Sequence, residues 1–422
     1  MATTQFVSTN ANAALIPSIW TPTTLFKFAF ETNPLSKFMG EGSNSVVHIN
    51  NDFKAKKGDT ITTFLRGLLN EEGQGNDGDY EGYEEKMTFQ DANLVLGERG
   101  HSTKLAGNMT EQRAAMNLRR EAGTAIGEWI SRVQARDIID ALSGMPNMKN
   151  TGHITGASAV TVATAAGVGG TNVVPTTVTK LAVDKTAAIK RWIGGGQTAT
   201  GMAFASASGD VAITSAMLFG PAVIEQARAV ALKDVDDSGN PVCPLRPIQI
   251  KGYGTVFLML IDQWQAMQLR QNQDWIMAQR DANIDGVDNP LFTSAFGKWN
   301  DVLIHTTTLL HRRIYNASAS SADKPEAYFD ASTDSITATG MSAKGIGITR
   351  SLFLGAQACL LGWAKLPSLV IDPKDYSTKY AVHSDMIYGV KKAAFDARSS
   401  DGTTGTVTPF GCICVDTAVK YM

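Results

Sequence analysis

In two acidic turns, oxygen-bearing side chains are spaced as in a loop that binds an ion. Asp281, Asn283, Asp285 and Gly286 match the first half of a calcium loop, but the twelfth position is Phe292 instead of the bidentate Glu that calcium needs. The turn from Asp234 to Gly239 fails in the same way, because its twelfth position is Leu245. We interpret both segments as turns that close helices and predict no metal site.

Other motifs that would indicate catalysis are missing from the sequence. Gly-x-x-x-x-Gly-Lys-Ser/Thr does not occur, and no Gly-x-Gly-x-x-Gly directly follows a predicted strand and opens a helix, so no phosphate or nucleotide site is predicted. No Gly-x-Ser-x-Gly and no His-Glu-x-x-His occurs either, and the six histidines are scattered. The four cysteines lack the spacing of a zinc site or a disulfide framework. We therefore predict no catalytic residues, no cofactor and no enzymatic activity.

Composition and net charge further narrow the class of protein. The 422 residues are 43% hydrophobic and 18% charged, which is typical of a globular chain. The formal net charge is 38 − 40 = −2, which disfavours a sequence-reading DNA-binding protein. No signal peptide and no apolar window of about 20 residues is found, so we expect a soluble protein made in the cytoplasm.

Two segments look unable to form a core of their own. Residues 1–44 place aromatic residues between prolines and polar turns, and we interpret them as an arm that packs on its own body or on a neighbouring subunit. Residues 70–85 are glycine-rich and acidic with no basic residue, between β-branched runs at 59–66 and 86–96; another such run covers 45–49. Like charges and glycine destabilise an isolated hairpin, so we expect a projecting loop.

A very long amphipathic helix follows. Thr110 is the expected N-cap, and Gly144 and Pro146 follow the expected end at Ser143. Apolar residues recur at three-to-four spacing along one side, while Gly123 and Gly127 suggest a close approach by another segment. The sequence thus predicts a rod of roughly 50 Å.

The remainder predicts an α+β fold. Residues 145–213 indicate an insertion of short strands and loops around a small helix at 185–192. Further helices are predicted at 215–233, with a bend or start at Gly220-Pro221, and at 262–282 and 348–363; strands are predicted at 250–261, 301–307, 368–372, 386–395 and 410–416. The mixed order is typical of the α+β class.

A set of short motifs resembles a known family. They are Lys57-Gly58-Asp59-Thr60-Ile61, Phe64-Leu65-Arg66-Gly67, Gly107-Asn108-Met109-Thr110, Phe257-Leu258 before Gln263, Asp288-Asn289-Pro290-Leu291-Phe292, Gly297-Lys298-Trp299, Gly355-Ala356-Gln357-Ala358 and Tyr388-Gly389-Val390-Lys391-Lys392. Together with the acidic hairpin and the long helix, their order resembles major capsid proteins of tailed bacteriophages related to the capsid protein of the coliphage N-four. Residues 146–213 match no part of that pattern.

The resemblance implies a Hong Kong 97-type capsid fold. The implied regions are an N-terminal arm (1–50), an extended loop (51–104), a spine helix of the peripheral domain (105–145), an insertion (146–213), an axial domain (214–375) and returning C-terminal strands (376–422). It also implies self-assembly as pentamers and hexamers into an icosahedral shell enclosing double-stranded DNA, located in the virion after synthesis in the host bacterial cytoplasm. Decoration, scaffolding and portal proteins are possible partners, contact with DNA would be non-specific, and no membrane is involved.

Candidate residues for contacts between subunits follow from both arguments. They are the arm aromatics Trp20, Phe26, Phe28 and Phe30, the acidic loop residues Glu71, Glu72, Asp77, Asp79 and Glu81, and the helix arginines Arg119, Arg120, Arg132 and Arg136. The acidic tip would seek a basic surface on its neighbour, either these arginines or Lys54, Lys56 and Lys57. A solvated charge run without a partner is the alternative for the tip. Two further classes stay open: an encapsulin-like compartment shell, and an enzyme without a recognisable motif.

Overall fold

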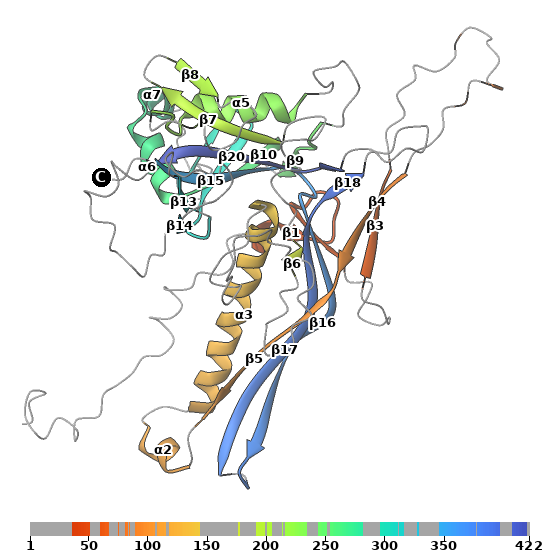
Figure 1. Ribbon diagram of the computed structural model, residues 1–422, viewed down its shortest axis with the longest axis vertical. Helices are drawn as coiled ribbons and strands as arrows, with labels where there is room; N and C mark the ends of the chain where they lie inside the picture. Colours follow the sequence, from red (N-terminus) through yellow and green to blue (C-terminus); the bar gives the residue numbers. More distant parts are fainter. Residues whose placement is uncertain are drawn as a thin grey trace, which may run out of the picture.

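The computed structural model describes most of the body of the chain. The described residues are 36–50, 60–66, 75, 81–82, 84, 89–105, 108–114, 118–143, 176–177, 191–198, 201–204, 213, 216–233, 244–250, 254–281, 296–310, 312–315, 327–328, 346–376, 378–396 and 407–419. Figure 1 shows a compact upper part, built on one sheet, and a long lower part in which a helix runs beside extended strands.

The upper part is a ten-stranded sheet. Its main order is β11 (Gly297–Trp299), β12 (Val302–Thr306), β10 (Gly254–Ile261), β15 (Ile346–Leu354), β20 (Cys412–Val419), β7 (Trp192–Thr198) and β8 (Gly201–Phe204), with β9 (Ile248–Ile250), β13 (Arg312–Tyr315) and β14 (Ala327–Tyr328) paired off this path. Helices α5 (Pro221–Ala231), α6 (Gln263–Gln271) and α7 (Gln273–Asp281) belong to the same part (Figure 1). Buried Val223, Phe257 and Phe353 join helices and sheet in one apolar cluster.

The lower part is a six-stranded sheet with a helix against it. The strand order is β1 (Met39–Gly40), β2 (Val47–Asn50), β16 (Cys359–Lys374), β17 (Lys379–Lys392) and β5 (Gly97–Lys104), and β6 (Thr176–Thr177) also pairs with β17. Helix α3 (Leu118–Ser143) packs on this sheet, with Ala122 and Ile126 against Val382. Strands β3 (Thr60–Arg66) and β4 (Phe89–Val95) form a ribbon, β18 (Ala394–Asp396) and β19 (Val407–Pro409) form another, and η2 (Ser36–Phe38) and α2 (Asn108–Arg113) complete the elements.

Local signals account for the helix positions in the upper part. Pro221 begins α5 directly after the extended Gly220. This confirms the helix start predicted at Gly220-Pro221. Asp262 and Gln265 form a capping box at the start of α6. The predicted helix at 262–282 is interrupted at Asn272, whose backbone is extended and whose side-chain oxygen accepts a hydrogen bond from the Asp274 N–H, so α7 starts anew.

The expected helix at 348–363 is wrong. These residues form all but the first two residues of β15 and the start of β16, joined by a turn at Gly355-Ala356-Gln357 in which Gln357 has a φ of 55°. β15 lies between β10 and β20 and is buried on both faces, so its side chains do not alternate between buried and exposed. A short apolar run of this kind cannot be distinguished from a buried helix by periodicity.

Other boundaries also differ from the sequence-based expectation. The predicted rod from Thr110 to Ser143 is two helices, because α2 ends at Arg113 and α3 begins at Leu118, and Thr110 lies inside α2 instead of capping it. At 26 residues, α3 is about 39 Å long. Trp192, the expected end of a small helix, begins β7 and pairs with Cys414, while residues 185–190 lie outside the described residues.

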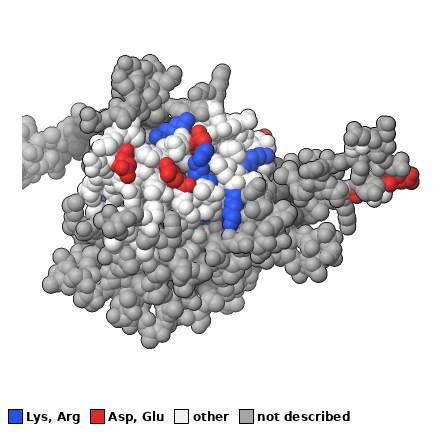
Figure 2. Space-filling model, turned by 90° about the horizontal axis from the view of Figure 1, so that it is seen from above, with Lys and Arg blue, Asp and Glu red and all other residues white. Residues whose placement is uncertain are grey.

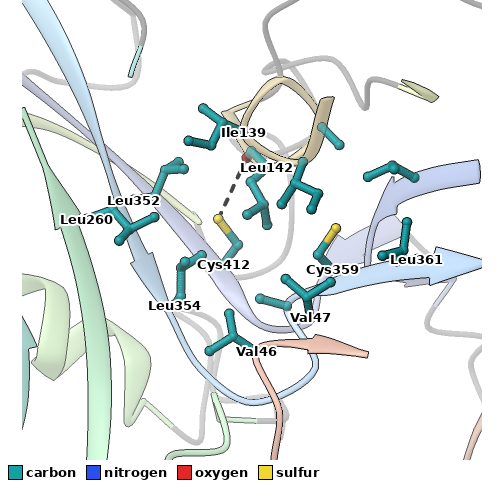
Figure 3. Close-up of a cluster of buried hydrophobic side chains, with 14 of the residues drawn as sticks. Val46, Val47, Ile139, Leu142, Leu260, Leu352, Leu354, Cys359, Leu361 and Cys412 are labelled. Carbon is teal, nitrogen blue, oxygen red and sulfur yellow. Dashed lines mark hydrogen bonds between the residues drawn. The ribbon is translucent and has the colours of Figure 1, made fainter. Parts of the chain in front are cut away.

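The C-terminus of α3 ends between the two sheets. Val46, Leu142, Leu352 and Cys412 belong to one buried cluster there, shown in Figure 3, where a dashed line joins the Cys412 thiol to the Leu142 carbonyl. Arg350 of β15 donates one hydrogen bond to the Ser143 carbonyl, at 2.7 Å, and two to Asp416 of β20, at 2.8 and 2.7 Å. The helix end is therefore held by side chains of the ten-stranded sheet.

Residues 36–50, the first described segment of the chain, are tied to the upper part. Asn44 exchanges two hydrogen bonds with the backbone of Gln249 in β9, at 2.6 and 2.7 Å. Phe38 packs edge-on against His305 at the end of β12, with ring centroids 5.2 Å apart. Burial, with a smaller contribution from the charge of Lys37, lowers the pKa of His305 to about 4.

The His305 contact predicts a pH dependence of stability. Below pH 6.5 the unfolded chain protonates this imidazole while the folded chain does not until about pH 4, so folding becomes less favourable as the pH falls through that window. The contribution reaches at most about 3 kcal/mol at 1.36 kcal/mol per pH unit. His305→Phe, which keeps a ring against Phe38, should show a shallower loss of unfolding free energy between pH 6.5 and 4.5 in urea titrations. If the unfolding free energy fell equally steeply with pH in both proteins, the lowered pKa of His305 would be refuted.

Candidate functional site

The β3–β4 ribbon presents two different faces. Its strands pair antiparallel from Thr60–Val95 to Arg66–Phe89. On the inner face Ile61 and Leu94 are each 1% exposed and pack with Leu360 and Ala393, whereas Phe64 on the other face is 70% exposed. Because side chains alternate along a strand, the ribbon is anchored by one face and offers an apolar residue to its surroundings on the other.

Two glycines let the ribbon approach the six-stranded sheet. A Cβ on Gly362 of β16 would lie 2.5 Å from Ile61 Cδ1, and a Cβ on Gly389 of β17 would lie 2.4 Å from the Val95 carbonyl oxygen. The second contact is with backbone, which cannot move aside like the end of a side chain. Gly389 therefore fixes where the ribbon leaves the body.

Substituting Gly389, with Gly127 of α3 as a control, should separate a packing clash from a change in helix propensity. Gly389→Ala should lower the unfolding free energy by about 1 to 3 kcal/mol, because the new methyl group overlaps the Val95 carbonyl. Gly127→Ala in α3 is the matched control: nothing lies within 4 Å of its Cβ position, so the free energy should rise by up to about 1 kcal/mol. Urea unfolding measures both, and a neutral Gly389→Ala would contradict this packing.

A buried polar cluster fixes the strand that follows the ribbon. Arg99 of β5 and the Tyr388 hydroxyl of β17 both donate hydrogen bonds to Asp137 Oδ2 of α3, and Arg99 Nη1 also lies 3.3 Å from the Tyr388 hydroxyl. Asp137 and Tyr388 are fully buried. Burial raises the pKa of Asp137 and of Tyr388, and the charge of Arg99 opposes the shift in both groups. One carboxylate thus joins three elements.

Two variants should rank the members of this cluster. Asp137→Asn leaves the mostly buried Arg99 without its carboxylate, so we expect a loss of about 3 to 5 kcal/mol in unfolding free energy. Tyr388→Phe removes the hydrogen bond donated to Asp137 and the longer one accepted from Arg99, and should cost about 1 to 2 kcal/mol. If chemical denaturation gave Asp137→Asn a cost no larger than that of Tyr388→Phe, the carboxylate would not be the centre of the cluster.

Most of the predicted contact residues lie outside the described residues. Those are Trp20, Phe26, Phe28, Phe30, Glu71, Glu72, Asp77 and Asp79, and the same holds for the side chains of Arg119 and Arg120. Glu81 is described and exposed, beside Gly82, whose φ of 94° forms a turn. Arg132 is exposed on α3. Arg136 is half-buried, and burial lowers its pKa despite the opposing charge of Asp140.

Sequence reasoning missed the residues that position the projecting strands. Arg99, Asp137 and Tyr388 stand far apart in the sequence and carry no shared motif. Gly389 belonged to a stretch quoted only for its family resemblance. Of the two helix glycines expected to be approached closely, Gly123 is, with a Cβ position 3.2 Å from Leu369 Cδ2, whereas Gly127 faces open space in the single chain.

The described residues were compared with the requirements of a metal site and of a membrane span. They contain no group of three or more His, Cys, Asp or Glu side chains able to hold a metal ion. None of the described helices is long and apolar enough to span a membrane. Figure 2 views the molecule from above, and on the part of this face that is described it shows basic and acidic side chains interspersed among uncharged residues.

The architecture defines a structural protein of the shell-forming class. A helix and long strands extend away from the compact ten-stranded sheet (Figure 1), and a separate ribbon projects beside them, as in the Hong Kong 97-type fold. The chain belongs to the phage capsid protein family, whose model matches residues 19–421. It is a major capsid protein of a tailed bacteriophage, with the α+β fold that the sequence predicted.

Solved capsid structures share this fold. The capsid of Ralstonia phage GP4 is 18% identical with a TM-score of 0.71, over 100% of this chain and 99% of that chain. The capsid of cyanophage Pam1 is 17% identical with a TM-score of 0.62, over 99% of both chains. That of Helicobacter pylori bacteriophage KHP30 is 14% identical with a TM-score of 0.62, over 99% of this chain and 100% of that chain. No curated protein matches the sequence.

Proposed function

We propose that this capsid protein assembles as pentamers and hexamers into an icosahedral shell that encloses double-stranded DNA. The observation that carries the proposal is the two-faced ribbon, because Phe64 is 70% exposed on a strand whose other face buries Ile61 against the body. An exposed aromatic residue of this kind is typical of a surface that another molecule covers. In a shell every subunit has further copies of the chain as neighbours, so a second copy is the partner that would cover this surface.

Each proposed region would have its own role in assembly. The arm at 1–50 and the extended loop at 51–104 would reach neighbouring subunits, and the spine helix at 105–145 would give them a rigid base. The part at 214–375 would surround the local symmetry axes, and residues 376–422 would return to the body. Gly82 with its positive φ supports an adjustable loop, which would let one sequence serve five-fold and six-fold settings.

Charge supports a specific contact for the loop tip. Glu71, Glu72, Asp77, Asp79 and Glu81 would meet basic residues of the neighbour, and Arg132 is the more exposed of the two candidate arginines whose side chains are described. Arg136 is the weaker candidate, because it faces Asp137 and Asp140 of its own helix. The arm aromatics Trp20, Phe26, Phe28 and Phe30 would be covered by a neighbour in the same way.

Particles would identify the function directly. The chain purified from a lysate should form closed particles tens of nanometres across in negative-stain images, and particles from infected cells should protect double-stranded DNA from nuclease. Discrete small oligomers at every concentration and ionic strength would refute assembly. Particles filled with an enzyme instead of DNA would favour the encapsulin-like shell, which the match to phage capsid proteins makes the weaker reading.

The loop tip should be needed for closure and dispensable for folding. Deleting residues 73–84 removes most of the acidic tip and none of the described strands, so the unfolding free energy should change by less than about 0.5 kcal/mol. Closed particles should be lost in sedimentation and in negative-stain images. Particles as abundant as those of the unaltered chain would show that the tip has no role in closure.

Partners beyond the chain itself are part of the proposal. Decoration, scaffolding and portal proteins would bind the assembled shell, and packaged DNA would contact its inner wall without sequence specificity. The net charge of −2 fits weak contact with DNA, since each neutralised phosphate adds salt-dependent affinity. We propose no enzymatic activity, and synthesis in the host bacterial cytoplasm before incorporation into the virion.

A further inference from the structure

A buried lysine faces a buried cysteine where the C-terminus of α3 meets the two sheets. Lys392, the last residue of β17, and Cys414 of β20 are both 0% exposed. The Lys392 ammonium donates a hydrogen bond to the Cys414 sulfur, with nitrogen and sulfur 3.6 Å apart. A fully buried lysine is rare, because its ammonium loses its hydration. Since β17 belongs to the six-stranded sheet and β20 to the ten-stranded sheet, this contact spans both.

Two neighbouring thiols provide comparisons for Cys414. Cys412, on the same face of β20, lies 3.7 Å from the Leu142 carbonyl oxygen, and Cys414 lies 3.6 Å from the same atom. Cys359 is fully buried, and burial raises its pKa to about 12, which is typical of an unreactive thiol. At Cys414, sulfur and amine nitrogen are already in contact, so only a small movement of the flexible lysine side chain separates them from covalent bonding.

We propose that dioxygen oxidises this pair to a covalent bridge in which one oxygen atom links the Lys392 nitrogen to the Cys414 sulfur. The ammonium first releases a proton. The S–H bond and one N–H bond then break, S–O and O–N bonds form, and the second oxygen atom leaves with the two hydrogen atoms as water. Sulfur and nitrogen each give up two electrons, which balances the four electrons that dioxygen accepts.

The surroundings of the pair favour this oxidation. Cys414 belongs to the buried apolar cluster that also holds Leu142 and Leu352, and apolar interiors admit small apolar molecules such as dioxygen. The oxidised pair is neutral, so the cost of a buried ammonium disappears. A reducing cytoplasm would keep both groups reduced. The bridge would therefore form after particles leave the host and meet air, a timing that rests on the proposed shell function.

Mass spectrometry of the purified full-length chain tests the bridge. The chain is purified without oxygen, and half of it is exposed to isotopically heavy dioxygen before thiol blocking and digestion at acid pH. The peptides of Lys392 and Cys414 should be linked, with one heavy oxygen atom gained and two hydrogen atoms lost, at least about tenfold more abundantly than in the unexposed half. The urea midpoint of the exposed half should rise, because the bridge closes a loop in the unfolded chain.

Three variants locate the bond. Cys414→Ser and Lys392→Met should lose the linked product and the shift in midpoint, whereas the matched control Cys412→Ser should keep both. Absence of the linked product from the oxygen-exposed unaltered chain would overturn the proposal, whether or not the variants fold. A link without the heavy oxygen atom, or a disulfide at Cys414 in its place, would overturn it as well. None of these results bears on shell assembly, because the chemistry is measured within one chain.

Discussion

The structure depends on how the C-terminus of α3 is buried. A helix end leaves four carbonyls without intrahelical partners and carries the negative end of the helix dipole, and both are costly in an apolar interior. The last turn of α3 has no basic residue of its own. Arg350 supplies the charge from β15, its guanidinium is fixed bidentately by Asp416, and Asp416 also accepts from the Trp192 indole at 2.7 Å.

Two thiols also contact the carbonyls at the C-terminus of α3. The Cys412 and Cys414 thiols lie 3.7 and 3.6 Å from the Leu142 carbonyl, and the buried Lys392 ammonium lies 3.6 Å from the Cys414 sulfur. These contacts come from β15, β17 and β20, so the ten-stranded sheet, the six-stranded sheet and the helix share one joint. This joint holds α3 and the six-stranded sheet against the ten-stranded sheet, and the Asp137 cluster ties β5 and β17 to α3 farther along the helix.

The sequence predicted the parts whose signals are local. The Gly220-Pro221 start of α5, the apolar stripe of α3 and the β-branched strands around the acidic hairpin all rest on neighbouring residues, and the structure confirms them. The α+β class and the family resemblance were also correct. Residues 348–363 were mistaken for a helix because a strand buried on both faces has no alternation. The Arg350–Asp416 pair and the Asp137 cluster join residues far apart in the chain, so no spacing could reveal them.

The central claim is that the interior of this subunit is complete in the single chain, whereas its projecting strands are completed by other copies. Hydrogen exchange of assembled particles against dissociated subunits tests it most directly. The account predicts that amides of β20 and of the last turns of α3 are equally protected in both states, while amides of β3 and of Leu369 to Lys374 gain protection only in particles. Unchanged exchange in the projecting strands, or a joint that becomes protected only on assembly, would contradict it.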